Sequence, residues 1–107
     1  MNPDERTQWL ERIKAAVLAV EPTATVMLYG SRARGDARPD SDWDFLILLD
    51  GKVDYARERE VRLKLYPMEW ETGEVINAIV HSWEDWESEP IRWTPFRENI
   101  DREGVSI

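Results

Sequence analysis

Apolar residues follow two patterns along the chain, a helical periodicity and short continuous runs, which predict alternating helices and strands. A helix is predicted near the N-terminus, where apolar residues follow at steps of three and four: Trp9, Ile13, Ala16, Val17 and Val20. Residues 24–29 and 42–49 form short apolar runs that are typical of buried strands. Pro and Gly separate these runs from their neighbours, so the elements can be placed along the whole chain.

The predicted series begins with a helix that Pro3 opens and Glu21-Pro22 ends near residue 20. A strand over 24–29, a helical turn over 31–35, a loop over 36–41 and a strand over 42–49 follow. The remaining elements are a helix from 54 to about 66, which Pro67 interrupts, a strand over 75–80, a weak helix after Ser82, a last helix from Thr94-Pro95 to Gly104, and a tail. This order predicts one α/β or α+β domain of about three strands, residues 1–107.

Composition excludes several classes of site. The chain has no cysteine and one histidine, which excludes disulfide scaffolds, thiol nucleophiles, cysteine-bound metals and multi-histidine metal cages. No apolar run approaches the roughly 18 residues of a membrane span. The acidic N-terminus lacks the basic-then-apolar order of a signal peptide. We therefore expect a soluble, cytoplasmic protein.

Charge is unevenly distributed along the chain. The net charge is −8, and residues 67–107 hold ten acids against three bases. This acidic third argues against autonomous nucleic-acid binding and fits a basic protein partner, although it is equally compatible with a simple solvated surface. The same third carries Trp70, Trp83, Trp86 and Trp93, and we expect at least one of them at a partner surface.

Candidate chemistry is concentrated between two predicted strands. Gly30-Ser31 follows the first, and after ten further residues Asp42-Trp43-Asp44 begins the second. Strand side chains alternate, so Asp42 and Asp44 share one face. Two adjacent carboxylates repel one another, and a hard divalent cation such as Mg²⁺ or Mn²⁺ removes that repulsion.

The turn before these carboxylates is suited to phosphate. Gly30 lets the backbone approach an anion without an intervening Cβ, and the Ser31 hydroxyl and free N–H groups of the turn can bind it. Arg32 and Arg34 lie in the same region and are candidates for phosphate contacts.

These residues resemble the nucleotidyltransferase superfamily related to DNA polymerase beta, whose mark is Gly-Ser, a ten-residue gap and Asp-x-Asp. Residues 29–49 resemble its minimal nucleotidyltransferase branch, with further matches at Arg32, Gly35 and Ser41. The resemblance covers nearly the whole chain. It implies a small mixed sheet of about three or more strands flanked by helices.

The resemblance also implies an activity and a partner. The activity is Mg²⁺-dependent transfer of AMP, or another nucleoside monophosphate, from a nucleoside triphosphate such as ATP to an acceptor. Minimal members are commonly antitoxins of HEPN-domain ribonuclease toxins, and in such pairs the antitoxin transfers AMP to a toxin tyrosine. The resemblance thus implies catalytic and metal roles for Asp42 and Asp44, and nucleotide binding by Gly30, Ser31, Arg32 and Arg34. The number of subunits stays open.

The chain departs from the family pattern in one place. A third carboxylate is expected on the strand over 75–80, and Asn77 occupies the expected position. Glu69, Glu71 and Glu74 are alternative sources of that carboxylate.

Asn77 leaves two main functions open, an adenylyltransferase antitoxin and a catalytically weak module that neutralises a toxin by masking it. A third, transfer to a cationic small molecule such as an aminoglycoside, fits the acidic surface, but the chain has no room for a second domain that would shape the pocket.

Overall fold

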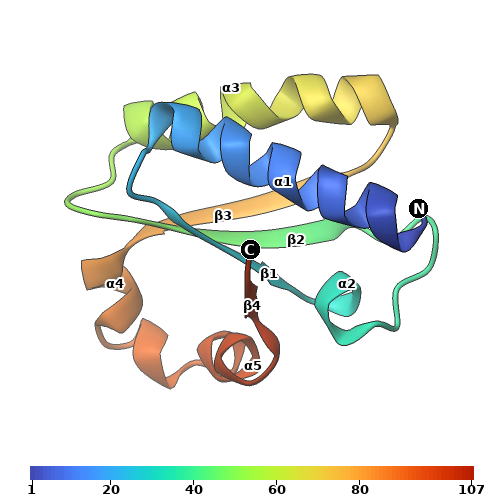
Figure 1. The fold of residues 1–107 in the computed structure, drawn as a ribbon. Coiled ribbons are helices and arrows are strands. Elements are labelled where there is room, and N and C mark those ends of the chain that lie inside the picture. Colours follow the sequence, from blue (N-terminus) through green and yellow to red (C-terminus); the bar gives the residue numbers. More distant parts are fainter.

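The computed structural model describes residues 1–107 as a four-stranded sheet flanked by helices (Figure 1). The long helices are α1 (Pro3–Val20) and α3 (Tyr55–Thr72), and the shorter helical elements are α2 (Ser31–Arg34), α4 (Trp83–Glu87), the 3₁₀ helix η1 (Ile91–Trp93) and α5 (Pro95–Glu103). The strands are β1 (Thr25–Tyr29), β2 (Trp43–Leu49), β3 (Ile76–Ser82) and β4 (Val105–Ser106). This mixed α+β architecture confirms the predicted fold class.

The strand order across the sheet is β3-β2-β1-β4. β1 pairs antiparallel with both β2 and β4, whereas β2 and β3 run parallel because helix α3 connects them. The register places Tyr29 opposite Asp44 across β1 and β2, and Asp44 opposite Asn77 across β2 and β3. Residues from three strands therefore meet at the beginning of β2.

Helices cover the two faces of the sheet unequally. Figure 1 shows α1 and α3 along one face, with α4 and α5 on the other. On the first face Phe45 and Ile47 of β2 join the larger apolar core, while on the second face Leu46 and Leu48 pack in a smaller core with Trp86 and other residues. Strand β2 is thus buried on both faces along most of its length. No helix is long and apolar enough to cross a bilayer.

The predicted end of the helix over 54–66 was wrong. Helix α3 continues through Pro67 to Thr72, although proline lacks the N–H that would bond to the preceding turn. Met68, one residue later, is buried in the core, and Gly73 ends the helix in the left-handed conformation with its N–H bonded to Glu69. Packing and this cap stabilise the last turns.

The C-terminal tail forms the fourth strand, which the residue pattern did not predict. Its two residues pair with Met27 and Leu28 of β1, and the Ile107 N–H donates to the Val26 carbonyl at 3.0 Å. The strand is too short for its alternation to be recognised in the sequence.

Arg57 joins the end of α1 to the segment that leads into α3. Its guanidinium donates to both carboxylate oxygens of Glu21, at 3.0 and 2.7 Å, and to the carbonyls of Asp50 and Lys52, at 2.8 and 2.6 Å. Hydrogen bonding to Glu21 raises the pKa of Arg57 above its ordinary value. Arg57 therefore provides hydrogen-bond donors to two backbone carbonyls that lie outside the helices and strands.

We expect Arg57→Ala to lower the free energy of unfolding by about 1–3 kcal/mol, because it removes charge-assisted hydrogen bonds at a partly buried site. Urea unfolding followed by circular dichroism measures this. The matched control is Arg59→Ala, an exposed arginine without a hydrogen-bond or ion-pair partner, which should change stability by less than about 0.5 kcal/mol. Equal effects of the two substitutions would contradict the role assigned to Arg57.

Candidate active site at the start of strand β2

The predicted phosphate turn and the predicted carboxylates meet at one end of the sheet. Gly30-Ser31 directly follows β1, and Asp42-Trp43-Asp44 begins β2. Because the two strands are antiparallel neighbours, the end of β1 lies beside the beginning of β2. Ser31 begins α2, and the ten intervening residues, 32–41, complete that helix and form a loop.

Asp42 and Asp44 are bridged by the side chain of Asn77. The Asn77 amide nitrogen donates to Asp42 Oδ2 at 2.9 Å and to Asp44 Oδ1 at 3.2 Å. The parallel register of β2 and β3 places Asn77 beside Asp44, and strand alternation places Asp42 on the same face. Trp43, which lies between them in the sequence, points to the other face of the sheet and is buried in the larger core. The sequence prediction that both carboxylates share one face agrees with this geometry.

Gly30 lies against this carboxylate pair. Its φ of 73° and ψ of −159° belong to a region that essentially only glycine occupies. A Cβ at this position would overlap Asp44 Oδ2 and approach Asp44 Cγ to 3.2 Å. The backbone of the turn can therefore lie beside Asp44 only because residue 30 has no side chain. The Ser31 hydroxyl makes no hydrogen bond within the protein.

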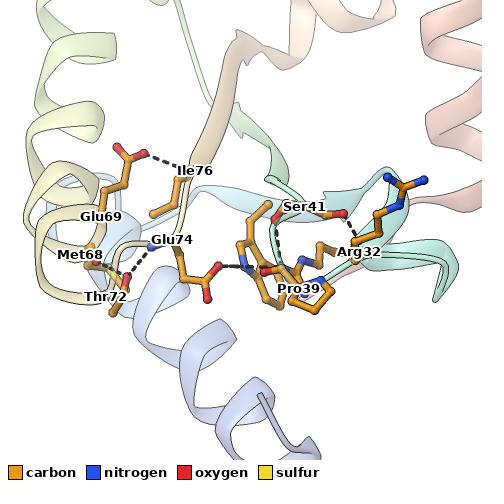
Figure 2. Close-up of polar contacts among 10 residues, drawn as sticks. Arg32, Pro39, Ser41, Met68, Glu69, Thr72, Glu74 and Ile76 are labelled. Atoms are coloured by element: carbon orange, nitrogen blue, oxygen red, sulfur yellow. Dashed lines mark hydrogen bonds and ion pairs between the residues drawn. The ribbon is translucent and has the colours of Figure 1, made fainter.

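Arg32 anchors the loop between α2 and β2. Its guanidinium lies 4.5 Å from the centre of the Trp43 ring and donates to the carbonyls of Pro39 and Ser41 at 3.2 and 2.9 Å. Glu74, whose carboxylate also accepts the Trp43 indole N–H, lies 3.8 Å away. Figure 2 shows this arrangement, with Pro39 and Ser41 of the loop beside Arg32 and Glu74 nearby. These contacts hold the segment that leads into Asp42.

Arg34, the second arginine predicted to bind phosphate, makes ion pairs with two acids. Its guanidinium lies 3.2 Å from Asp36 and 3.1 Å from Glu103, and hydrogen bonds to Asp36 and then Glu103 raise its pKa. Neither Arg32 nor Arg34 contacts Asp42 or Asp44. Arg34 is nevertheless 45% exposed, against 14% for Arg32, so it is the freer of the two to exchange partners.

None of the three glutamates considered as a third carboxylate contacts the aspartate pair. Glu69 accepts the Ile76 N–H, Glu71 pairs with Arg12, and Glu74 binds Trp43, as described above. Figure 2 shows Glu69 and Glu74 engaged at the end of α3 and the start of β3. Nowhere in the chain do three or more histidine, cysteine, aspartate or glutamate side chains gather to form a metal-binding cluster. The aspartate pair is completed by an amide instead.

Two residues that border the site were not given a functional role from the sequence. Tyr29 and Arg62 line a shallow groove of about 390 Å³ together with Asp44, Asn77 and neighbouring residues of β3. Burial, and secondarily the charge of Asp44, raises the pKa of Tyr29 to about 12. Arg62 belongs to helix α3, and its guanidinium donates a hydrogen bond of 2.9 Å to the Ala78 carbonyl. Tyr29 could have been found from its place directly before Gly30, whereas Arg62 lies 18 residues beyond Asp44 and carries no local signal.

Comparison with known proteins supports the relationship that the motif indicates. The model of the nucleotidyltransferase domain family matches residues 10–107. A protein of Methanocaldococcus jannaschii is 40% identical over 79 residues, which cover 74% of this chain and 72% of the relative. Its name assigns it provisionally to the protein adenylyltransferases.

The fold is similar to that of a solved structure. That structure is the crystal structure of a toxin–antitoxin with AMP-PNP, in which the matched chain superposes with a TM-score of 0.64 at 15% sequence identity. The match covers 90% of this chain and 69% of that chain, and at this identity it supports the fold alone. Together with the family match over most of the sequence, the comparisons show that this chain belongs to the nucleotidyltransferase domain family and is a nucleotidyltransferase.

Proposed function

We propose that the chain transfers AMP from ATP to a hydroxyl group of a protein, and that the acceptor is the HEPN-domain toxin of a toxin–antitoxin pair. The observation that carries the catalytic part is the contact between the Gly30 turn and the Asp42–Asp44 pair. It puts a phosphate-binding backbone directly beside a carboxylate pair. The M. jannaschii relative's name supports a protein acceptor, and the toxin–antitoxin structure supports a toxin.

The residues at this pair fit Mg²⁺ or Mn²⁺. Asp42 and Asp44 offer hard oxygen donors, and no lysine or arginine of the chain neutralises them. When bound, the ion would neutralise charge that develops on the triphosphate and align it for in-line attack. Asp42 and Asp44 would hold it through their carboxylate oxygens.

The chain's own groups then have distinct tasks. The N–H groups of the Gly30-Ser31 turn and the free Ser31 hydroxyl bind triphosphate oxygens. The acceptor oxygen forms a bond to the α-phosphorus as the bond to pyrophosphate breaks, and the acceptor proton passes to a carboxylate oxygen of the aspartate pair. Arg34 releases its ion pair with Asp36 and binds the leaving pyrophosphate instead. Arg32 keeps the loop before Asp42 in place.

Surface properties support a protein partner. Trp70 is 90% exposed and Trp93 is 70% exposed, although tryptophan is usually mostly buried. Exposed tryptophans are enriched at binding hot spots, and the acidic charge of the C-terminal third favours a basic partner. The cytoplasm is the compartment that we propose for both proteins.

A second candidate function rests on Asn77. An amide at the third position leaves one fewer negative charge for metal ions, which favours a module of weak activity that neutralises its toxin by masking it. The two functions differ in whether the aspartate carboxylates are needed.

We expect Asp44→Asn and Asp42→Asn each to reduce label transfer from α-labelled ATP to the partner protein by about 100-fold or more, because each removes a charge that binds the metal. The assay uses the chain copurified with its partner, in the presence of Mg²⁺. Asp40→Asn is the matched control, since Asp40 is an exposed loop carboxylate without a partner, and it should retain activity. If neutralisation of the toxin persists in the Asp44→Asn variant, the masking function is correct and the enzymatic one is wrong.

Gly30→Ala is expected to abolish transfer while leaving a folded protein. The added Cβ overlaps Asp44 Oδ2, so the turn must move away from the carboxylates. Gly35→Ala is the control, because Gly35 also has a positive φ of 87° but no atom lies within 4 Å of its added Cβ. Gly35→Ala should lower the free energy of unfolding by about 1 kcal/mol and preserve most activity. Equal loss of transfer in both variants would show that backbone strain alone is responsible.

Tyr29 should keep its proton throughout the physiological range. Its pKa is raised from 10.0 to about 12, so the unfolded chain releases this proton at lower pH than the folded one. Its contribution to stability is therefore present below pH 10.0 and is lost as the pH rises towards about 12. We expect Tyr29→Phe to flatten this part of the stability profile, measured by urea unfolding with a chelator present. Phenolate absorbance should show one tyrosine that titrates late in the parent protein, and its absence would contradict the burial effect.

A further inference from the structure

Asn77 is the one side chain that holds the two aspartates together. It donates to Asp42 and Asp44 at 2.9 and 3.2 Å, from a strand that runs parallel to theirs. A carboxylate can only accept hydrogen bonds, so the amide must present its nitrogen, not its oxygen, to both. With both aspartates ionised, the pair has this amide as its only side-chain donor.

The same amide orientation is unsuitable for a cation. Metal ligation requires the carbonyl oxygen, which lies on the other side of the amide group. Without a cation, the negative charges of Asp42 and Asp44 attract the N–H groups of the amide and repel its oxygen. With a cation between them, the nitrogen is repelled and the oxygen is attracted. One rotatable bond therefore separates two states of the site.

We propose that Asn77 is a rotating ligand that makes divalent-ion binding depend on the nucleotide; this inference rests on the proposed transferase function. In the free protein the amide bridges the aspartates and stabilises the empty pair. A free ion must break both hydrogen bonds and then meets two negative charges instead of three, so it binds weakly. The phosphates of ATP supply the missing negative charge, and the ion enters with the nucleotide.

The charge count predicts how substitutions alter the site. Asn77→Asp adds a third carboxylate of nearly the same shape and removes the bridging donor. It should raise the affinity for free Mn²⁺ by about tenfold or more, because ligand charge strongly tunes such affinities. It should also lower the melting temperature of the metal-free protein, because three carboxylates then repel one another. Asn77→Ala removes the bridge but also the amide oxygen that would ligate the ion, and it adds no charge, so it should raise the affinity for free Mn²⁺ much less than Asn77→Asp does.

Mn²⁺ titration tests these expectations, with bound ion measured by the loss of the free-ion electron paramagnetic resonance signal. The parent, Asn77→Asp, Asn77→Ala and Asp44→Asn proteins are titrated without nucleotide and with a non-hydrolysable ATP analogue. The proposal expects weak binding to the parent alone, at least about tenfold tightening with the analogue, and tight binding to Asn77→Asp without it. Melting temperatures with chelator and with Mn²⁺ give a second readout.

Equal Mn²⁺ affinities of the parent and Asn77→Asp, with binding lost in Asp44→Asn, would overturn the inference but leave the transferase function intact. Tight Mn²⁺ binding to the parent without nucleotide would overturn it as well. If Asn77→Asp does not fold, the comparison of the parent with and without the analogue decides. If the parent binds neither Mn²⁺ nor the analogue, the proposed function itself fails.

Discussion

The antiparallel pairing of β1 with β2 is the constraint on which the site depends. It places Tyr29 opposite Asp44, so the chain must turn immediately after Tyr29 while remaining beside the carboxylate. Only a residue without a Cβ fits there, because Asp44 fills the space that a side chain would take. The turn that we propose for phosphate binding and the carboxylate that we propose for metal binding are thereby fixed relative to one another by strand register, not by a flexible loop. The parallel β2–β3 register then adds Asn77 to the same point.

Arg32 shows how the loop between these strands is kept in place. Its guanidinium stacks on a tryptophan that belongs to the main core and binds two carbonyls of the loop. Glu74 connects the same tryptophan to the end of α3, since it accepts the indole N–H. The loop that delivers Asp42 is thus fastened to the core through one aromatic ring. Arg32 therefore has a positioning role in the structure, although it lies next to the glycine turn where a phosphate contact was predicted.

Local patterns predicted much of the fold and the centre of the site. Strand alternation was enough to place Asp42 and Asp44 on one face, and capping residues such as Ser82 and Thr94 marked helix starts that the structure contains. What could not be predicted depends on contacts between distant residues. The partners of Arg32 and Glu74, the continuation of α3 through Pro67 and the pairing of Val105 with β1 are set by tertiary packing. The sequence showed Asn77 at the position where a third carboxylate is expected, but its bridging contact could be seen only from the strand register.

The geometry of the site also bears on the choice between catalysis and masking. Gly30 adopts a backbone conformation that is unfavourable for every other residue, and Asp42 and Asp44 are held together despite their repulsion. The like charges of the two carboxylates oppose folding, and neither they nor Gly30 contribute to the buried cores. A module that acted only by covering its toxin would need a surface, and the exposed tryptophans lie outside this site. Like charges concentrated beside a turn that only glycine can form, with an amide that offsets the repulsion, are the properties expected of a site that binds a cation and phosphate.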